Sequence, residues 1–176
     1  MLKKYYILFL LFILFQIFAY FFSNINFLSN NSDSSGYIYP SDTTIISSEY
    51  GYRDLFGYTN FHNGTDFPAP QGSNVYATAD GIVKSIGFVN GYGITITLLH
   101  PNNYISMYCH VAENVDEFVY IGKHVRQGDI IANVGPKYLS NGIQNGLTTG
   151  PHLHFTVFNE NNNTIDPMSL NLQEKK

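Results

Sequence analysis

One short segment of the chain carries two groups that commonly bind metal ions. His62 and Asp66 are separated by Asn-Gly-Thr. Gly64 and the prolines that follow disfavour a helix here, so both side chains are expected on extended chain. Because side chains alternate along an extended chain, the even offset allows both to lie on one face. The pair can therefore supply two ligands to one metal ion.

A second segment has the sequence His-Leu-His, and on a strand His152 and His154 point to the same side. Three ligands from His62, Asp66 and His154 would leave the fourth position of a tetrahedral zinc ion for water, as in a catalytic site. A histidine beside that water could accept its proton or stabilise an oxyanion. A two-histidine-one-carboxylate iron oxygenase uses the same ligand types and is an alternative. In such oxygenases the histidine and the carboxylate are usually two residues apart, whereas His62 and Asp66 are four residues apart.

The chain from Thr43 onward consists of short apolar or alternating runs separated by Gly, Pro and Asn, which predicts a mainly β, antiparallel domain. In one run, residues 94–99, isoleucines are expected inward and threonines outward. The expected strands are residues 74–79 paired with 81–86 through a turn at Asp80-Gly81, then 94–99, 104–110, 119–121, 129–134 and 153–158, with a further strand beginning at Ile45-Ile46.

An apolar leader precedes this domain. The segment 5–22 is interrupted only by Gln16 and would span about 27 Å as a helix, close to the thickness of a hydrocarbon core. Lys3 and Lys4 precede it and predict a cytoplasmic N-terminus. Residues 1–22 are therefore expected to be an uncleaved transmembrane anchor. A cleaved signal peptide is the alternative, although its apolar region is usually shorter and ends in small residues.

The composition of the chain argues against two further classes of protein. Nine scattered basic residues and a net charge of −4 argue against a nucleic-acid-binding surface. A single cysteine, Cys109, excludes a disulfide scaffold and is expected to point into the core. The predicted division of the chain is a leader at 1–22, a Ser/Asn-rich linker at 23–42, the β domain at 43–170 and a tail at 171–176.

Further motifs accompany the two histidine segments across residues 47–167. They are Ser48 with Gly51-Tyr52-Arg53, Val75 to Gly81, Gly91-Tyr92-Gly93, Tyr108-Cys109-His110, Gly122 with Val125 and Gly128, Thr149 to Phe155, and Asp166-Pro167. In this order and spacing, the chain resembles the lysostaphin-type (LytM-like) zinc metallopeptidases, which are peptidoglycan endopeptidases. The resemblance covers essentially the whole predicted β domain.

This resemblance implies a fold, a cofactor and a set of roles. The implied fold is a small antiparallel β-sheet domain of the duplicated hybrid motif type, with a substrate groove and the metal on the groove floor. His62, Asp66 and His154 correspond to the ligands of one Zn²⁺. His110 and His152 correspond to the catalytic histidines beside a metal-bound water that acts as the nucleophile. The implied substrates are the peptide cross-links of bacterial peptidoglycan.

The leader and the implied substrate both indicate a location outside the cytoplasm. A domain in the cell envelope, anchored in the membrane and facing the periplasm or exterior, can meet peptidoglycan, as can a secreted domain if the leader is cleaved. A non-catalytic wall-binding or hydrolase-activating module of the same fold is the alternative function. Such relatives have lost zinc ligands, whereas this chain keeps all five metal and catalytic positions. Residues 136–148 exceed the usual family length and predict a loop beside the groove.

Overall fold

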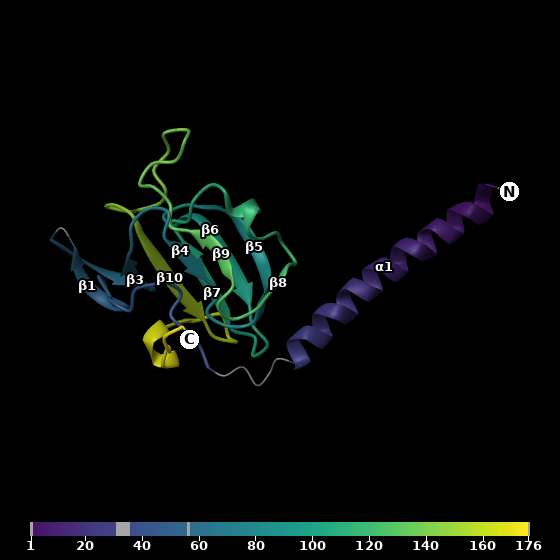
Figure 1. The fold of residues 1–176 in the computed structure, drawn as a ribbon, viewed down its shortest axis with the longest axis horizontal. Helices are drawn as coiled ribbons and strands as arrows, with labels where there is room; N and C mark the ends of the chain where they lie inside the picture. Colours follow the sequence, from purple (N-terminus) through teal and green to yellow (C-terminus); the bar gives the residue numbers. More distant parts are fainter. Residues whose placement is uncertain (1, 31–35, 56, 176) are drawn as a thin grey trace.

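The computed structural model describes residues 2–30, 36–55 and 57–175, and it consists of an N-terminal helix and a β domain (Figure 1). The helix is α1 (Leu2–Asn30). The strands are β1 (Gly51–Leu55), β2 (Tyr58–His62), β3 (Thr65–Pro68), β4 (Asn74–Tyr76), β5 (Gly81–Val89), β6 (Gly93–Leu99), β7 (Ile105–Cys109), β8 (His124–Val125), β9 (Ile130–Asn133), β10 (His152–Phe158) and β11 (Thr164–Ile165), with short 3-10 helices η1 (Val115–Glu117) and η2 (Pro167–Leu170).

Helix α1 contains a segment, Tyr5–Ser23, that is long and apolar enough to cross a membrane, and none of this segment is buried. A core helix would bury an apolar face against the rest of the domain, so a core role is disfavoured. A membrane span and a signal sequence both fit these properties. The helix continues to Asn30, beyond the predicted end of the leader at residue 22. Residues 31–35 of the predicted linker lie outside the described residues.

The main sheet is antiparallel and has the strand order β11-β10-β7-β6-β5-β8. Strand β10 pairs with β7 along one edge, while β3 and β11 share its other edge. The predicted strands at 94–99, 104–110, 129–134 and 153–158 are confirmed as β6, β7, β9 and β10, and β6 and β7 form a hairpin. The chain is therefore mainly β and antiparallel, as predicted.

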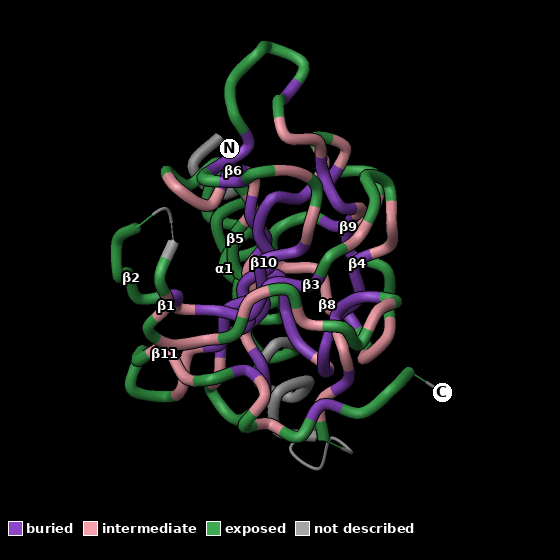
Figure 2. The backbone as a smooth tube through the Cα atoms, turned by 90° about the vertical axis from the view of Figure 1, so that its left-hand side faces the viewer, coloured by how far each residue is buried: buried purple, intermediate pink, exposed green. Residues whose placement is uncertain are grey.

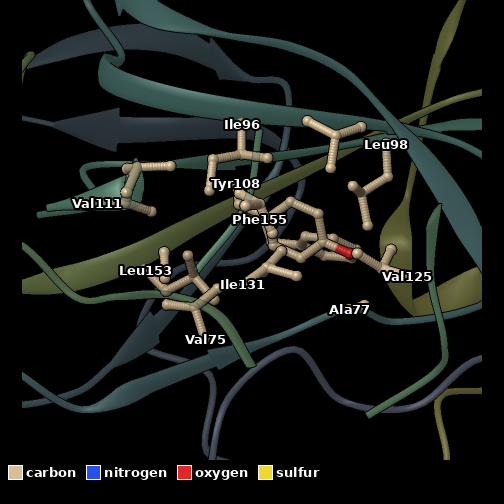
Figure 3. Packing of buried hydrophobic residues seen from close by; sticks show 14 of the residues in the cluster. Val75, Ala77, Ile96, Leu98, Tyr108, Val111, Val125, Ile131, Leu153 and Phe155 are labelled. Carbon is tan, nitrogen blue, oxygen red and sulfur yellow. The ribbon is translucent and has the colours of Figure 1, made fainter. Parts of the chain in front are cut away.

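The core lies between the main sheet and the small sheet formed by β4 and β9 (Figure 3). Buried segments run through the centre of the domain and exposed segments surround them (Figure 2). From the main sheet come Ile96, Leu98, Tyr108, Leu153 and Phe155, and from the opposite side come Val75, Ala77 and Ile131, all fully buried. Burial of these apolar side chains is the main favourable contribution to folding and holds the strands of the site in register.

The predicted pairing of residues 74–79 with 81–86 is wrong. Strand β4 pairs with β9, and β5 pairs with β6 and β8. Between β4 and β5 the chain passes from the small sheet to the main sheet, and the backbone N–H of Thr78 donates to the Tyr108 hydroxyl at 2.9 Å. The turn signal at Asp80-Gly81 therefore marks a change of layer rather than a hairpin.

Other local expectations differ from the structure. Residues 119–121 form no strand, because the Val119 N–H bonds to Val115 O and closes a helical turn after η1. Residues 45–46 form no strand either. In β6, Ile96 and Leu98 are buried as expected, but Thr95 is buried too, and its hydroxyl donates to the Gly87 carbonyl at 3.1 Å.

Segments predicted to lie outside the domain bond to it. Ile38 is buried and bridges to Gln173, and the Tyr39 N–H donates to the Gln173 carbonyl at 3.0 Å. Leu172, in the predicted tail, is also buried. These contacts favour a folded unit that begins near Tyr37 and ends near Gln173.

A buried histidine, His100, lies at the same end of the sheet as this terminal segment. It is 1% exposed, its ring packs edge-on against Tyr37, and its nitrogens lie 2.8 Å from the Asp80 carbonyl oxygen and from Ser106 Oγ. Burial lowers the pKa of His100 to about 4, although the Asp80 contacts act in the opposite direction. The ring is therefore neutral in the folded protein near pH 7.

The pH dependence of stability tests this arrangement. The unfolded His100 titrates near 6.5 and the folded one near 4, so the unfolded state binds more protons in this window and stability rises with pH across it. The group should contribute roughly 3 kcal/mol of unfolding free energy that is lost as pH falls from 7 to 4. Urea unfolding over this range should show a smaller pH dependence in His100→Gln than in the wild type. Equal slopes for His100→Gln and wild type would contradict the prediction.

Candidate functional site

Three strands bring a histidine, an aspartate and a second histidine together. His62 ends β2, Asp66 lies in β3, and His154 lies in β10 directly opposite Asp66. Gly64 makes the tight connection between β2 and β3. An added Cβ at this position would lie 2.7 Å from His154 Nε2, so only glycine leaves room for the imidazole.

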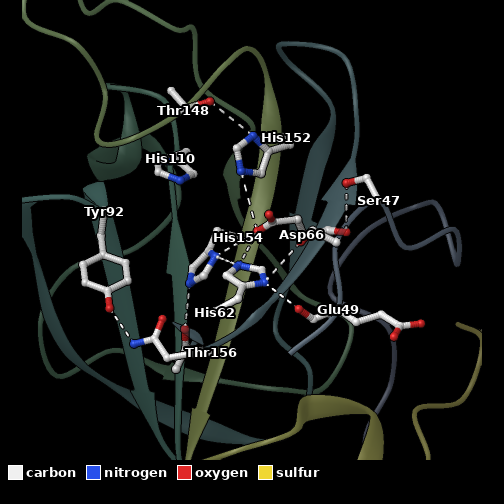
Figure 4. Close-up of polar contacts among 12 residues, drawn as sticks. Ser47, Glu49, His62, Asp66, Tyr92, His110, Thr148, His152, His154 and Thr156 are labelled. Atoms are coloured by element: carbon white, nitrogen blue, oxygen red, sulfur yellow. Dashed lines mark hydrogen bonds and ion pairs between the residues drawn. The ribbon is translucent and has the colours of Figure 1, made fainter. Parts of the chain in front are cut away.

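The ligand atoms of these residues converge (Figure 4). His154 Nδ1 lies 2.8 Å and His62 Nε2 lies 3.1 Å from Asp66 Oδ1, and the two ring nitrogens are 2.9 Å apart. All three residues are buried, and their candidate ligand atoms lie within 4.8 Å of one another. The predicted proximity of His62 and Asp66 is found, but they lie on two strands rather than on one face of a single strand.

The outer hydrogen bonds of the rings indicate which nitrogens remain free. His62 Nδ1 lies 2.7 Å from the Glu49 carbonyl oxygen, which can only accept, so this nitrogen carries the proton. His154 Nε2 lies 2.9 Å from Thr156 Oγ1. In a neutral His62 ring, Nε2 is then an electron-pair donor aimed at a carboxylate oxygen, which is also an electron-pair donor. Such a cluster suits a cation, and outer partners of this kind orient metal-binding histidines.

Asp66 is held in its charged form. Its burial by itself raises the carboxyl pKa, but the close contacts with the imidazoles of His154 and His62 outweigh burial and keep the pKa well below its usual value. Its second oxygen, Oδ2, lies 3.4 Å from Arg53 Nη1. The Arg53 Nε in turn donates to Asn60 across the β1–β2 hairpin at 3.2 Å. The guanidinium therefore occupies one carboxylate oxygen and leaves Oδ1 to the imidazoles.

Two more histidines lie beside this cluster. The rings of His110, which follows β7, and His152, which begins β10, have centroids 4.7 Å apart. His110 Nδ1 lies 2.7 Å from the Asn145 carbonyl oxygen, and His152 Nδ1 lies 2.9 Å from that of Gly150. Each carbonyl requires a proton on Nδ1, so each Nε2 is available for proton transfer. Burial and the neighbouring His152 lower the pKa of His110 to about 4.

A groove passes over the cluster. One hollow of about 590 Å³ lies on the side of the β1–β2 hairpin and the β5–β6 turn, and a second of about 530 Å³ continues past the other side. The residues that line both are Arg53, Asp66, Leu147 and His152. The arrangement can therefore hold an extended chain with its centre above Asp66.

The structure thus brings together the five residues singled out from the sequence. Cys109 is fully buried, as expected, and burial raises the pKa of its thiol.

Of residues 136–148, Leu147 lines the groove, while Tyr138 and Gln144 bridge to form a small projecting hairpin. Sequence reasoning gave no role to Arg53 or Tyr92, although both lie in the quoted motifs. The Tyr92 hydroxyl accepts from Asn63 Nδ2 at 2.5 Å, and its ring lies against His154.

Comparisons with known proteins agree with this geometry. Residues 60–167 match the family described as "Peptidase family M23". The DD-carboxypeptidase/endopeptidase Mpg of Neisseria meningitidis is 34% identical over 137 residues, which cover 77% of this chain and 29% of Mpg. The peptidoglycan DD-endopeptidase ShyC of Vibrio cholerae is 33% identical over 119 residues, which cover 66% of this chain and 25% of ShyC. The chain therefore spans less than a third of the length of these relatives.

Solved structures show the same fold. A zinc-containing peptidase from Vibrio cholerae is 31% identical with a TM-score of 0.65, and the match covers 80% of this chain and 41% of that one. The catalytic domain of lysostaphin from Staphylococcus simulans is 27% identical with a TM-score of 0.57, and the match covers 71% of this chain and 90% of that one. Because the family match covers more than half of the sequence and includes every residue of the buried cluster, this chain belongs to peptidase family M23.

Proposed function

We propose that the chain is a zinc-dependent endopeptidase that hydrolyses peptide cross-links of bacterial peptidoglycan. The observation that carries this proposal is the buried convergence of His62, Asp66 and His154 beneath a groove, with two further histidines beside it. Family membership supports hydrolysis of peptide bonds. The names of the relatives Mpg and ShyC support peptidoglycan as the substrate.

The donor set fits one zinc ion. His62 Nε2, Asp66 Oδ1 and His154 Nδ1 would hold it, and two nitrogens with one oxygen leave a tetrahedral site open at its fourth position. When bound, zinc polarises a carbonyl group and lowers the pKa of a coordinated water. The contacts of Glu49 and Thr156 with the outer ring nitrogens keep both imidazoles turned toward the ion.

His110 and His152 would move the protons of the reaction. Each ring has Nδ1 bonded to a backbone carbonyl, so each can accept a proton at Nε2 and later donate it. Hydrolysis requires one proton to leave the attacking water and one to reach the leaving amine nitrogen. The two neighbouring rings can serve these two steps, with the protonated ring also donating a hydrogen bond to the oxyanion.

The leader would place the domain near its substrate. Helix α1 contains a candidate membrane span, and Lys3 and Lys4 precede it, which favours a cytoplasmic N-terminus and an exported domain. We favour an uncleaved anchor in the cell envelope. Mass spectrometry of the protein from the membrane fraction tests this: a mature N-terminus between residues 23 and 32 would show instead that the leader is a cleaved signal.

Metal binding should stabilise the fold. The cluster exists only in the folded state, so zinc at about 100 times its Kd should add about 2.7 kcal/mol of stability. A thermal melt of the wild type should shift upward on addition of zinc, whereas His154→Ala should show no shift. His124→Ala, remote from the cluster, should keep the wild-type shift. A zinc-dependent shift in His154→Ala as large as that of the wild type would contradict the assignment.

Activity should divide the five residues into two groups. Replacement of His62, Asp66 or His154 by Ala should remove both zinc and hydrolysis. His110→Ala and His152→Ala should retain zinc and lose about 10²- to 10⁴-fold in kcat. New amino groups released from peptidoglycan sacculi and zinc content measure the two properties. Turnover at the wild-type rate in His152→Ala would refute its role, and zinc-loaded wild type that cleaves no sacculi would favour a non-catalytic wall-binding module.

A further inference from the structure

Asn145 is fully buried at the end of the 136–144 hairpin, where the chain returns to the groove. Its side-chain Oδ1 accepts a hydrogen bond from the Ile94 N–H at 2.8 Å, and its Nδ2 donates to the Val111 carbonyl at 3.1 Å. The amide therefore ties the start of β6 to the residue that follows His110. Both of its polar atoms are satisfied by backbone groups, as a buried amide requires.

The backbone carbonyl of the same residue contacts the His110 ring. It accepts a hydrogen bond from His110 Nδ1 at 2.7 Å, and this bond determines which ring nitrogen carries the proton. His110 lines the groove close to His152 (Figure 4). The tautomer and the direction of the His110 ring thus depend on where the Asn145 carbonyl lies.

His110 adopts a backbone conformation that a side chain rarely takes. Its φ is +59°, and its N–H and C=O bond to Tyr92 O at 3.0 Å and to Gly135 N at 2.8 Å. A conformation of this kind persists only where surrounding contacts hold it, and such residues gather at active sites. The bond to Asn145 adds a third constraint, this time on the side chain.

Two glycines make room for the Asn145 side chain and backbone, and a third fits its loop against residues 91–93. An added Cβ at Gly135 would lie 2.6 Å from Asn145 Nδ2, and one at Gly93 would overlap the Asn145 side chain. Gly146, directly after Asn145, has φ +80°, and an added Cβ there would lie 2.6 Å from Gly93 N. The close fit leaves little freedom for the Asn145 carbonyl.

We propose that Asn145 is a positioning residue for His110, which keeps the His110 ring in the Nδ1–H tautomer with Nε2 available to the substrate. The inference rests on the proposed catalytic role of His110. It assigns the side-chain amide the task of holding the loop, and the backbone carbonyl the task of orienting the ring. The Asn145 N–H also donates to the Lys137 carbonyl at 2.9 Å. This bond closes the base of the hairpin formed by residues 137–145, so Asn145 anchors the hairpin to the rest of the domain.

The tautomer can be measured without turnover. In zinc-loaded wild type with ¹⁵N-labelled histidine, the His110 ring, assigned by the loss of its signals in His110→Gln, should carry its proton on Nδ1. A proton on Nε2 would overturn the proposal. This measurement keeps the proposal falsifiable even if an Asn145 variant does not fold. An inactive wild type would count against the proposed function alone, because the spectrum does not depend on hydrolysis.

Asn145→Ala removes both side-chain bonds and should loosen the carbonyl. We expect kcat to fall about 10- to 100-fold, with zinc content and KM unchanged and with the His110 signals showing a mixture of tautomers. Asn159→Ala is the matched control, since this half-buried asparagine also holds a turn through backbone N–H groups, those of Asn161 and Asn163, and lies beyond the end of β10 opposite to His152. Unchanged kcat in Asn145→Ala would overturn the proposal. A loss of kcat with the wild-type His110 tautomer would also overturn it, because it would show a merely structural role.

Discussion

The position of strand β10 between β3 and β7 determines the geometry of the site. In this register His154 lies opposite Asp66 on one side and opposite Cys109 on the other, next to His110. A slip of one residue would turn His154 toward the core and bring Leu153 or Phe155, both fully buried, into the groove. Apolar burial therefore holds the register, and the register places the polar groups.

Protein groups balance the charge and satisfy the hydrogen-bonding atoms of the His62, Asp66 and His154 cluster only in part. Asp66 shares one oxygen with the imidazoles and gives the other to Arg53, while His62 and His154 each use their outer nitrogen for a contact away from the centre. The electron pairs that remain all point to one place. A cation there would complete the electrostatics of the site, which is how metal binding becomes coupled to folding.

The two ends of the main sheet contact different parts of the domain. At one end, β6 and β7 lead to the groove and to His110. At the other end, the same strands meet His100 and the terminal segment around Tyr37. The first described residues of the domain therefore lie at the end of the sheet away from the groove. In a membrane-anchored enzyme, this separation would leave the groove free to meet a substrate while the domain stays tethered.

The sequence by itself determined the class of the fold and singled out the candidate residues of the site. Short alternating runs predicted β6, β7, β9 and β10, and the spacing within the His62–Asp66 and His152–His154 pairs suggested that each pair shares a face, because these are local properties of extended chain. The association of the two pairs with His110 followed from the resemblance to a known family. Which strands pair was decided only by the tertiary structure. Strand β4 pairs with β9 rather than with β5, because burying Val75 and Ala77 requires a second layer. The Asn145 contact with His110 joins residues 35 apart in sequence, and no local pattern encodes a contact that depends on long-range packing.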